Sequence, residues 1–291
     1  IFGLIILVPV TLFTIGWASR NLIIDGLQDW YDANHEGTLE IGDVKATFLT
    51  GFPNVGFTIT EIFQKEKDPN TLKEQSIFID KALVTISARD LIQGDFQFKR
   101  ISIDSISIYS EVVSDQSYEY HLEQKLKKLQ QPKSPFVFPS WIDPNATRFS
   151  IEQLNIVAKD SLFHKDFDVA FSTISGQLSK NNSLVTGSLL FEAVVNKLGF
   201  NTQKGSFLKN TTVSGNPEFT LDTDKNLLQV SEFLLTLDDE QFTVRSSFDL
   251  PESAFHISLT NDKLHFESLR KFLADSIAKK LKPYAIAKPI Q

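Results

Sequence analysis

The chain of 291 residues contains no cysteine and no methionine. Without cysteine it cannot form disulfides, thiolate zinc sites or iron–sulfur clusters, and it has no thiol nucleophile. It also lacks an excess of basic charge, because 29 Lys and Arg stand against 36 Asp and Glu, which gives a net charge of −7. Nucleic-acid binders present a basic surface, so we expect no nucleic-acid partner.

Polar aromatic residues are also scarce, with 5 Tyr and 3 Trp against 25 Phe. Phenylalanine supplies a large apolar surface without a polar group. The composition, 42% hydrophobic and 22% charged, is that of a globular protein, and the length allows one or two domains. The missing methionine and the start at Ile1, inside an apolar run, lead us to expect a chain trimmed at its N-terminus.

The first segment, 1–19, is an apolar run without any ionisable side chain. As a helix it would be about 28 Å long, close to the roughly 30 Å of bilayer hydrocarbon. We therefore predict a transmembrane anchor, with Trp17 as an aromatic residue at the interface. The expected anchor residues are Leu4, Leu7, Leu12, Phe13 and Trp17.

A cleaved signal peptide is the alternative for this segment, suggested by the small residues Gly16 and Ala18. The run is longer than the roughly 7–15 residues of a signal-peptide core, which favours the anchor. Acidic residues dominate just after the run, whereas cytoplasmic flanks are rich in Lys and Arg. We expect the body of the protein outside the cytoplasm.

The sequence after the anchor divides by its hydrophobic periods. Ile23, Leu27, Trp30 and Tyr31 recur at helical spacing, which predicts an amphipathic helix over 20–36. From 37 the period becomes two, which predicts a β segment over 37–131 that includes a helix at 117–131. The alternation slips between Ile103 and Ile106, so we predict a β-bulge at Asp104 and Ser105.

A proline-rich stretch divides the body. Four prolines within 132–146 cannot join a helix or a central strand, so this stretch is predicted to be a connector packed on the sheet. Alternating apolar residues separated by turn signals predict an antiparallel strand meander over 147–262. A final amphipathic helix is predicted over 263–282, and 283–291 is expected to begin a further segment.

No motif in the sequence indicates catalysis. The five histidines lack metal-ligand spacing, and there is no nucleophile elbow, phosphate loop or calcium loop. We therefore expect no catalytic residue, no metal and no cofactor. What remains is a meander with one Phe-rich apolar face, which must fold on itself as a sandwich, close as a barrel or bind an apolar ligand. Pattern alone leaves these three possibilities open.

Several motifs resemble the AsmA family, in particular its Bacteroidetes members. The stretch 42–62 has the turn Gly51-Phe52-Pro53 between two strands, and 77–109 has the hairpin Leu91-Ile92-Gln93-Gly94-Asp95-Phe96. The stretch 200–222 and the helix ending in KKLKPY at 279–284 are also similar to AsmA-like proteins. The resemblance extends over nearly the whole chain.

The resemblance implies a single-span protein of the bacterial inner membrane with its body in the periplasm. Its β body would form an open U-shaped groove that moves phospholipid toward the outer membrane. On alternation, the expected lining is Phe149, Ile151, Val169, Phe171, Leu189, Phe191, Phe219, Leu221, Leu235, Leu237, Phe242 and Val244. Expected partners are phospholipid acyl chains and an envelope protein complex. The alternatives are an anchored scaffold with a closed sandwich, for a secretion or assembly complex, and an envelope hydrolase.

Overall fold

The computed structural model describes residues 24–25, 28–29, 31–32, 37–47, 54–68, 73–87, 89, 98–112, 147–250, 252 and 254–284. The predicted anchor at 1–19, the predicted helix at 117–131 and the connector at 132–146 lie outside these residues, as does 285–291. None of the helices among the described residues is both long and apolar enough to cross a membrane.

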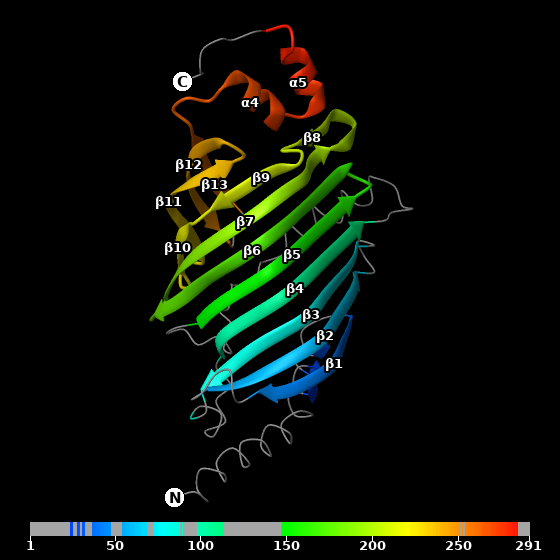
Figure 1. The fold of residues 1–291 in the computed structure, drawn as a ribbon, viewed down its shortest axis with the longest axis vertical. Coiled ribbons are helices and arrows are strands. Elements are labelled where there is room, and N and C mark those ends of the chain that lie inside the picture. Colours follow the sequence, from blue (N-terminus) through cyan, green and yellow to red (C-terminus); the bar gives the residue numbers. More distant parts are fainter. Residues whose placement is uncertain are drawn as a thin grey trace, which may run out of the picture.

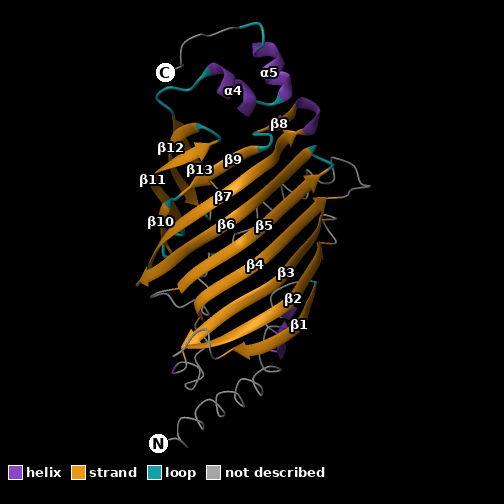
Figure 2. Cartoon of the chain, in the orientation of Figure 1, coloured by secondary structure: helices purple, strands orange, loops and turns teal. Residues whose placement is uncertain are grey.

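The described part of the chain is mainly β, as predicted. Thirteen strands form one sheet, and short helices lie at one end of it (Figures 1 and 2). The strands are β1 Thr38–Thr47, β2 Asn54–Asp68, β3 Lys73–Ser87, β4 Phe98–Val112, β5 Thr147–Asp160, β6 Lys165–Asn181, β7 Leu184–Asn201, β8 Gly205–Phe207, β9 Thr211–Gly215, β10 Glu218–Asp222, β11 Leu227–Leu237, β12 Glu240–Asp249 and β13 Ala254–Thr260. The helices are η1 Thr202–Lys204, α4 Phe266–Phe272 and α5 Asp275–Leu281.

Neighbouring strands in the sheet follow chain order almost throughout. The path runs β1 to β7 and then β10 to β13, while β8 pairs with β7 and β9 bridges β7 and β11. This confirms the long antiparallel meander. One pair differs, because β4 and β5 are parallel. In a parallel pair the end of one strand and the start of the next lie at opposite ends, so Val112 and Thr147 are far apart along the strands.

The prediction of a β-bulge at Asp104 and Ser105 is wrong, because no strand gains an extra residue at this level. Strand β4 has no net extra residue there against β3 or β5, because both neighbours break their pairing at the same level. Apolar positions flank the break three residues apart on each strand, as in Ile79 and Ala82 of β3. The salt bridge between Lys81 Nζ and Asp104 Oδ2, 2.7 Å long, spans this level. A matched irregularity keeps the strands in register where a single bulge would shift them.

The predicted amphipathic helix at 20–36 is helical at every described position between 24 and 32. Tyr31 is buried, and its hydroxyl donates a hydrogen bond to Glu66 Oε1 on β2 at 3.2 Å. Ile24 packs against the buried side chains of β1 to β3. Tertiary contacts therefore hold this helical segment against the first strands.

The predicted single helix at 263–282 is two short helices. Leu273 and Ala274 between α4 and α5 have extended backbones. The amide of Leu208 donates to the carbonyl oxygen of Phe272 at 3.1 Å, and Ala274 is buried. Docking of this corner onto β8 overrides the helical period, which by itself would continue through both segments.

Candidate functional site

Strand register places all twelve predicted lining residues on one face of the sheet, called the apolar face below. Residues paired across neighbouring strands point to the same side of a sheet. Phe149 of β5 pairs with Gly176 of β6, which pairs with Leu189 of β7. On the far side of β7, Gly187 pairs with Phe219 of β10. Strands β11 and β12 extend the same row, and the rings of Phe171 and Phe191 meet edge to face at 6.3 Å.

Glycines on the apolar face make room for phenylalanine rings from neighbouring strands. A side-chain carbon added to any of three glycines would lie within 3 Å of such a ring. The pairs are Gly176 with Phe149, Gly187 with Phe219, and Gly215 with Phe233. The rings therefore lie close against the bare backbone of the next strand and cover it with apolar surface at these three positions.

The apolar face is tightly packed at its N-terminal end. Val55, Phe57 and Ile86 are 1–2% exposed and form a buried cluster with neighbouring side chains of β1 to β3. Ile24, from the helical segment before β1, packs against this cluster. The sheet is therefore covered by described residues at this end.

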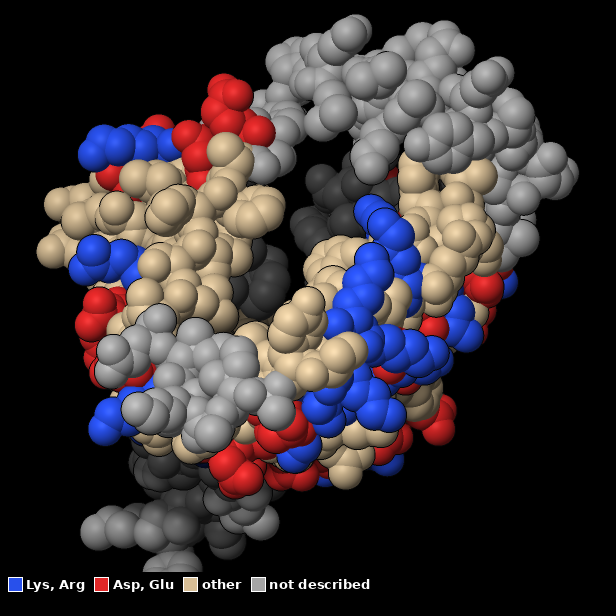
Figure 3. Space-filling view, turned by 90° about the horizontal axis from the view of Figure 1, so that it is seen from above, with Lys and Arg blue, Asp and Glu red and all other residues tan. Residues whose placement is uncertain are grey.

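The middle of the apolar face is only partly buried. Among the twelve predicted residues, Leu221, Leu237 and Val244 are buried, and the others are partly exposed. Figure 3 shows that the molecule is hollowed when seen from above, and that most of the Lys, Arg, Asp and Glu side chains in view lie on its outside. All described strands belong to one sheet, so no second described sheet covers this face.

Helix α4 covers the C-terminal end of the apolar face. Phe272 is buried, and its ring meets that of Phe242 on β12 at 6.3 Å. Glu240 accepts hydrogen bonds from the Ser268 hydroxyl and from His265, and these bonds lower the pKa of its carboxyl group. The same bonds hold the start of the helix in place. The Glu240 side chain is 12% exposed and lies 3.2 Å from Nδ1 of His265. A carboxylate at a helix N-terminus satisfies amides that have no partner within the helix.

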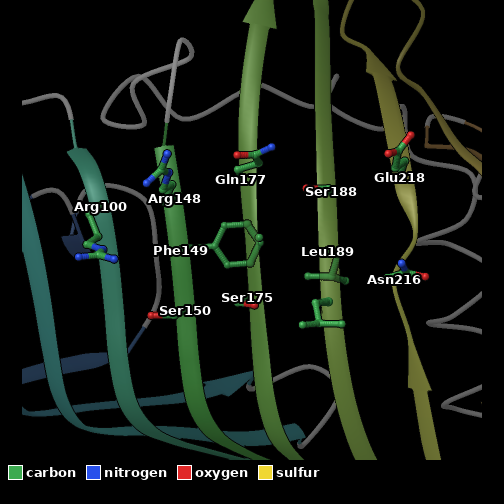
Figure 4. Close-up of a pocket in the computed structure, with 12 residues that line it drawn as sticks. Arg100, Arg148, Phe149, Ser150, Ser175, Gln177, Ser188, Leu189, Asn216 and Glu218 are labelled. Atoms are coloured by element: carbon green, nitrogen blue, oxygen red, sulfur yellow. The ribbon is translucent and has the colours of Figure 1, made fainter.

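The opposite face, called the polar face below, has a hollow near the strand ends (Figure 4). Its volume is about 560 Å³, and an adjoining hollow of about 420 Å³ shares Arg148, Gln177, Ser188 and Glu218 with it. These four side chains, with Arg100, form one row across five strands in direct register. The row lies close to the first residues of β4 and β5, at a rim of the sheet.

The two sides of this rim differ in chemistry. Arg148 lies on the polar face, and the next residue, Phe149, lies on the apolar face over Gly176. Two hydroxyl groups lie beside the arginines on the same strands, and the Ser102 and Ser150 oxygens are 3.0 Å apart. The rim thus places guanidinium and hydroxyl groups on one side and an aromatic ring on the other.

The described residues contain no group of three or more His, Asp or Glu side chains placed to bind a metal ion. The three described histidines lie far apart in the sequence: His164 directly precedes β6, His256 is in β13 and His265 directly precedes α4. Within this part of the chain, the features able to bind a ligand are therefore the apolar face and the hollow at the rim.

Sequence reasoning missed two parts of this site. Strands β2 to β4 extend the apolar face through residues such as Phe57 and Ile103. The sequence shows the alternation of these residues, but the predicted lining included only residues after 147. The row of Arg100 and Arg148 was also missed, because these residues meet only through the parallel pairing of β4 and β5. No spacing in the sequence shows that pairing.

The chain matches none of the known family models, and a search of curated proteins finds no match.

Proposed function

We propose that this chain is an AsmA-like lipid-transfer protein, anchored in the bacterial inner membrane by residues 1–19, with its body in the periplasm. The sheet would be an open U-shaped groove whose floor is the apolar face. Phospholipid acyl chains would move along that floor toward the outer membrane. The observation that supports this best is a continuous apolar face that crosses the whole sheet and is only partly buried in its middle.

The dimensions of the face suit a lipid path. The main strand path has eleven strands, and at about 4.8 Å per strand it extends roughly 48 Å across the sheet. This exceeds the roughly 30 Å thickness of bilayer hydrocarbon. A lipid chain gains about 0.8 kcal/mol for each CH₂ group moved from water to apolar surroundings. Contact with a Phe-rich floor therefore favours binding without any catalytic group.

The floor also suits movement along the path. The phenylalanine rings offer no hydrogen-bond donor or acceptor, so no position along the face binds a lipid much more tightly than its neighbours. The three ring-on-glycine contacts spread this character over β5, β6, β7, β9, β10 and β11. Similar apolar contacts at each step would keep the barriers between steps low.

A lipid-transfer assay tests the proposal. The full chain in donor vesicles is mixed with acceptor vesicles, and transfer of a fluorescent phospholipid is followed. We expect Phe171→Glu to slow transfer about tenfold or more, because a lipid chain that lies over this position would have to desolvate the new charge. The matched control is Leu234→Glu, which changes a residue of the polar face that is 54% exposed and lies outside both hollows. Equal transfer by both variants, with circular dichroism showing both folded, would contradict the proposal.

An anchored scaffold for an envelope complex is a second candidate, favoured by one observation. The polar face has an aromatic patch at β2 to β4, where Phe63 pairs with Phe78 and Tyr109 lies on the next strand. Phe78 and Tyr109 are 40% and 38% exposed. A scaffold predicts that Phe78→Glu, rather than Phe171→Glu, releases the chain from its complex in native gels.

A further inference from the structure

Two arginines of the polar face lie side by side without a compensating charge. Arg100 of β4 and Arg148 of β5 are direct partners in the parallel pairing, so their backbones lie about 4.8 Å apart. Both side chains are exposed, and neither forms a hydrogen bond or ion pair with any described residue. Like charges placed directly opposite each other on neighbouring strands destabilise a sheet.

The one acidic side chain in the same row lies too far away to neutralise them. Glu218 of β10 is separated from Arg148 by Gln177 and Ser188, which lie on the two strands between. Three strand spacings place its backbone about 14 Å from that of Arg148. Among the described residues of this row, no acidic side chain therefore lies close enough to neutralise the pair.

The other groups around the pair include hydrogen-bonding groups, which lie beside the apolar side chains of Phe149, Leu189 and Leu190. The two adjoining hollows are lined by serine hydroxyls, among them Ser150, Ser175 and Ser188, and by the amides of Gln177 and Asn216 (Figure 4). Guanidinium groups bind phosphate oxygens through two parallel hydrogen bonds, and hydroxyls and amides bind the remaining oxygens. The polar part of the lining therefore offers a phosphate group both positive charge and hydrogen-bond donors.

We propose that Arg100 and Arg148 bind the phosphate of a phospholipid headgroup at this rim. The proposal rests on the proposed function, which supplies the lipid. Arg148 is the second residue of β5, and Phe149 beside it faces the apolar side. A lipid whose chains lie on the apolar face has its headgroup at the rim, where the two guanidinium groups can reach it. The pair thus selects phosphate-bearing lipids and orients them along the groove.

The test measures binding to the full chain in maltoside micelles, a detergent without phosphate. The probes are dihexanoyl phosphatidylglycerol and inorganic phosphate, followed by isothermal titration calorimetry. Arg100→Gln and Arg148→Gln are each expected to weaken binding of the lipid about tenfold, and the double variant about 100-fold. The matched control is Arg245→Gln, an exposed arginine of β12 on the same face and outside both hollows, which should change affinity less than twofold.

Thermal unfolding gives a second, independent readout of the same binding. The short-chain lipid should raise the unfolding temperature of the unchanged chain and of Arg245→Gln, but not that of the double variant. Surface Arg→Gln changes rarely alter stability by more than about 0.5 kcal/mol, so the variants are expected to fold. Unchanged lipid affinity in the double variant would overturn the proposal.

The two probes separate the sources of the phosphate. A headgroup site predicts that inorganic phosphate binds at least tenfold more weakly than the lipid, because it gains nothing from the apolar face. Equal affinities would show a site for free phosphate and overturn the headgroup assignment. If Phe171→Glu abolishes lipid binding while Arg100→Gln with Arg148→Gln does not, the lipid groove stands and the headgroup site fails.

Discussion

The contact of Phe219 with Gly187 gives the most quantitative prediction about the apolar face. A carbon added at Gly187 would lie 2.3 Å from Cζ and 2.7 Å from Cε1 of Phe219. Carbon atoms in contact are normally about 3.5–4.0 Å apart, so the ring would have to move by on the order of 1 Å. The backbone of Gly187 does not lie in the left-handed region, so the need for glycine here is one of space.

We expect Gly187→Ala to destabilise the protein by about 1–3 kcal/mol, which is typical of overpacking. The sign of the change in unfolding free energy is informative. At an unstrained position Gly→Ala normally stabilises a protein by about 0.4–1 kcal/mol, because it lowers the conformational entropy of the unfolded chain. The free energy of unfolding is measured by urea denaturation followed by far-ultraviolet circular dichroism.

Phe219→Leu supplies the control, since leucine has no atoms where the ring lies over Gly187. In the double variant, Gly187→Ala should cost at least 1 kcal/mol less than it does alone, by about the coupling expected for residues in contact. Part of the cost should persist, because the carbonyl oxygen of Gln177 lies 3.0 Å from the added carbon. A stabilising Gly187→Ala, or additive effects of the two changes, would refute the arrangement of ring and glycine.

Two further predictions concern contacts at the ends of the sheet. Glu240→Gln should destabilise the protein by about 1 kcal/mol near pH 6, because it weakens the hydrogen bond from Ser268. Since the pKa of Glu240 is lowered in the folded state, this stabilisation is present above the ordinary glutamate pKa of about 4.3 and is lost as the pH falls through the lowered value, so the two unfolding midpoints should converge on acidification. Thr147→Val should cost about 1–2 kcal/mol in urea denaturation, because the hydroxyl of Thr147, 1% exposed, donates to the Phe98 carbonyl oxygen at 2.8 Å. An unchanged midpoint for Thr147→Val would mean that this bond adds nothing.

Much of the fold could be predicted from the sequence, because alternation is a local property. Residues such as Phe149, Ile151 and Leu189 alternate with polar neighbours, and the sheet places them together as a result. The meander follows from the same cause, since short turns between strands favour antiparallel neighbours. These predictions required no knowledge of distant contacts.

The errors have a common physical origin in contacts between distant segments. The break at Asp104 is matched by breaks in both neighbouring strands, and one strand's sequence does not show its partners. The helix over 263–282 is interrupted at Ala274 because this corner docks on β8. The pairing of Arg100 with Arg148 depends on the parallel register of β4 and β5, two segments that are far apart in the sequence.

The central claim, that lipid lies on the apolar face, is tested most directly by photo-crosslinking at two neighbouring positions. Leu235 faces the apolar side and Leu234 the polar side, so a photoreactive phenylalanine analogue placed at each samples opposite faces of the same strand. The full chain is irradiated in membranes, purified and examined by mass spectrometry for attached lipid. The account predicts phospholipid crosslinked at 235 and little at 234. Equal crosslinking at both positions, or none at 235, would contradict it.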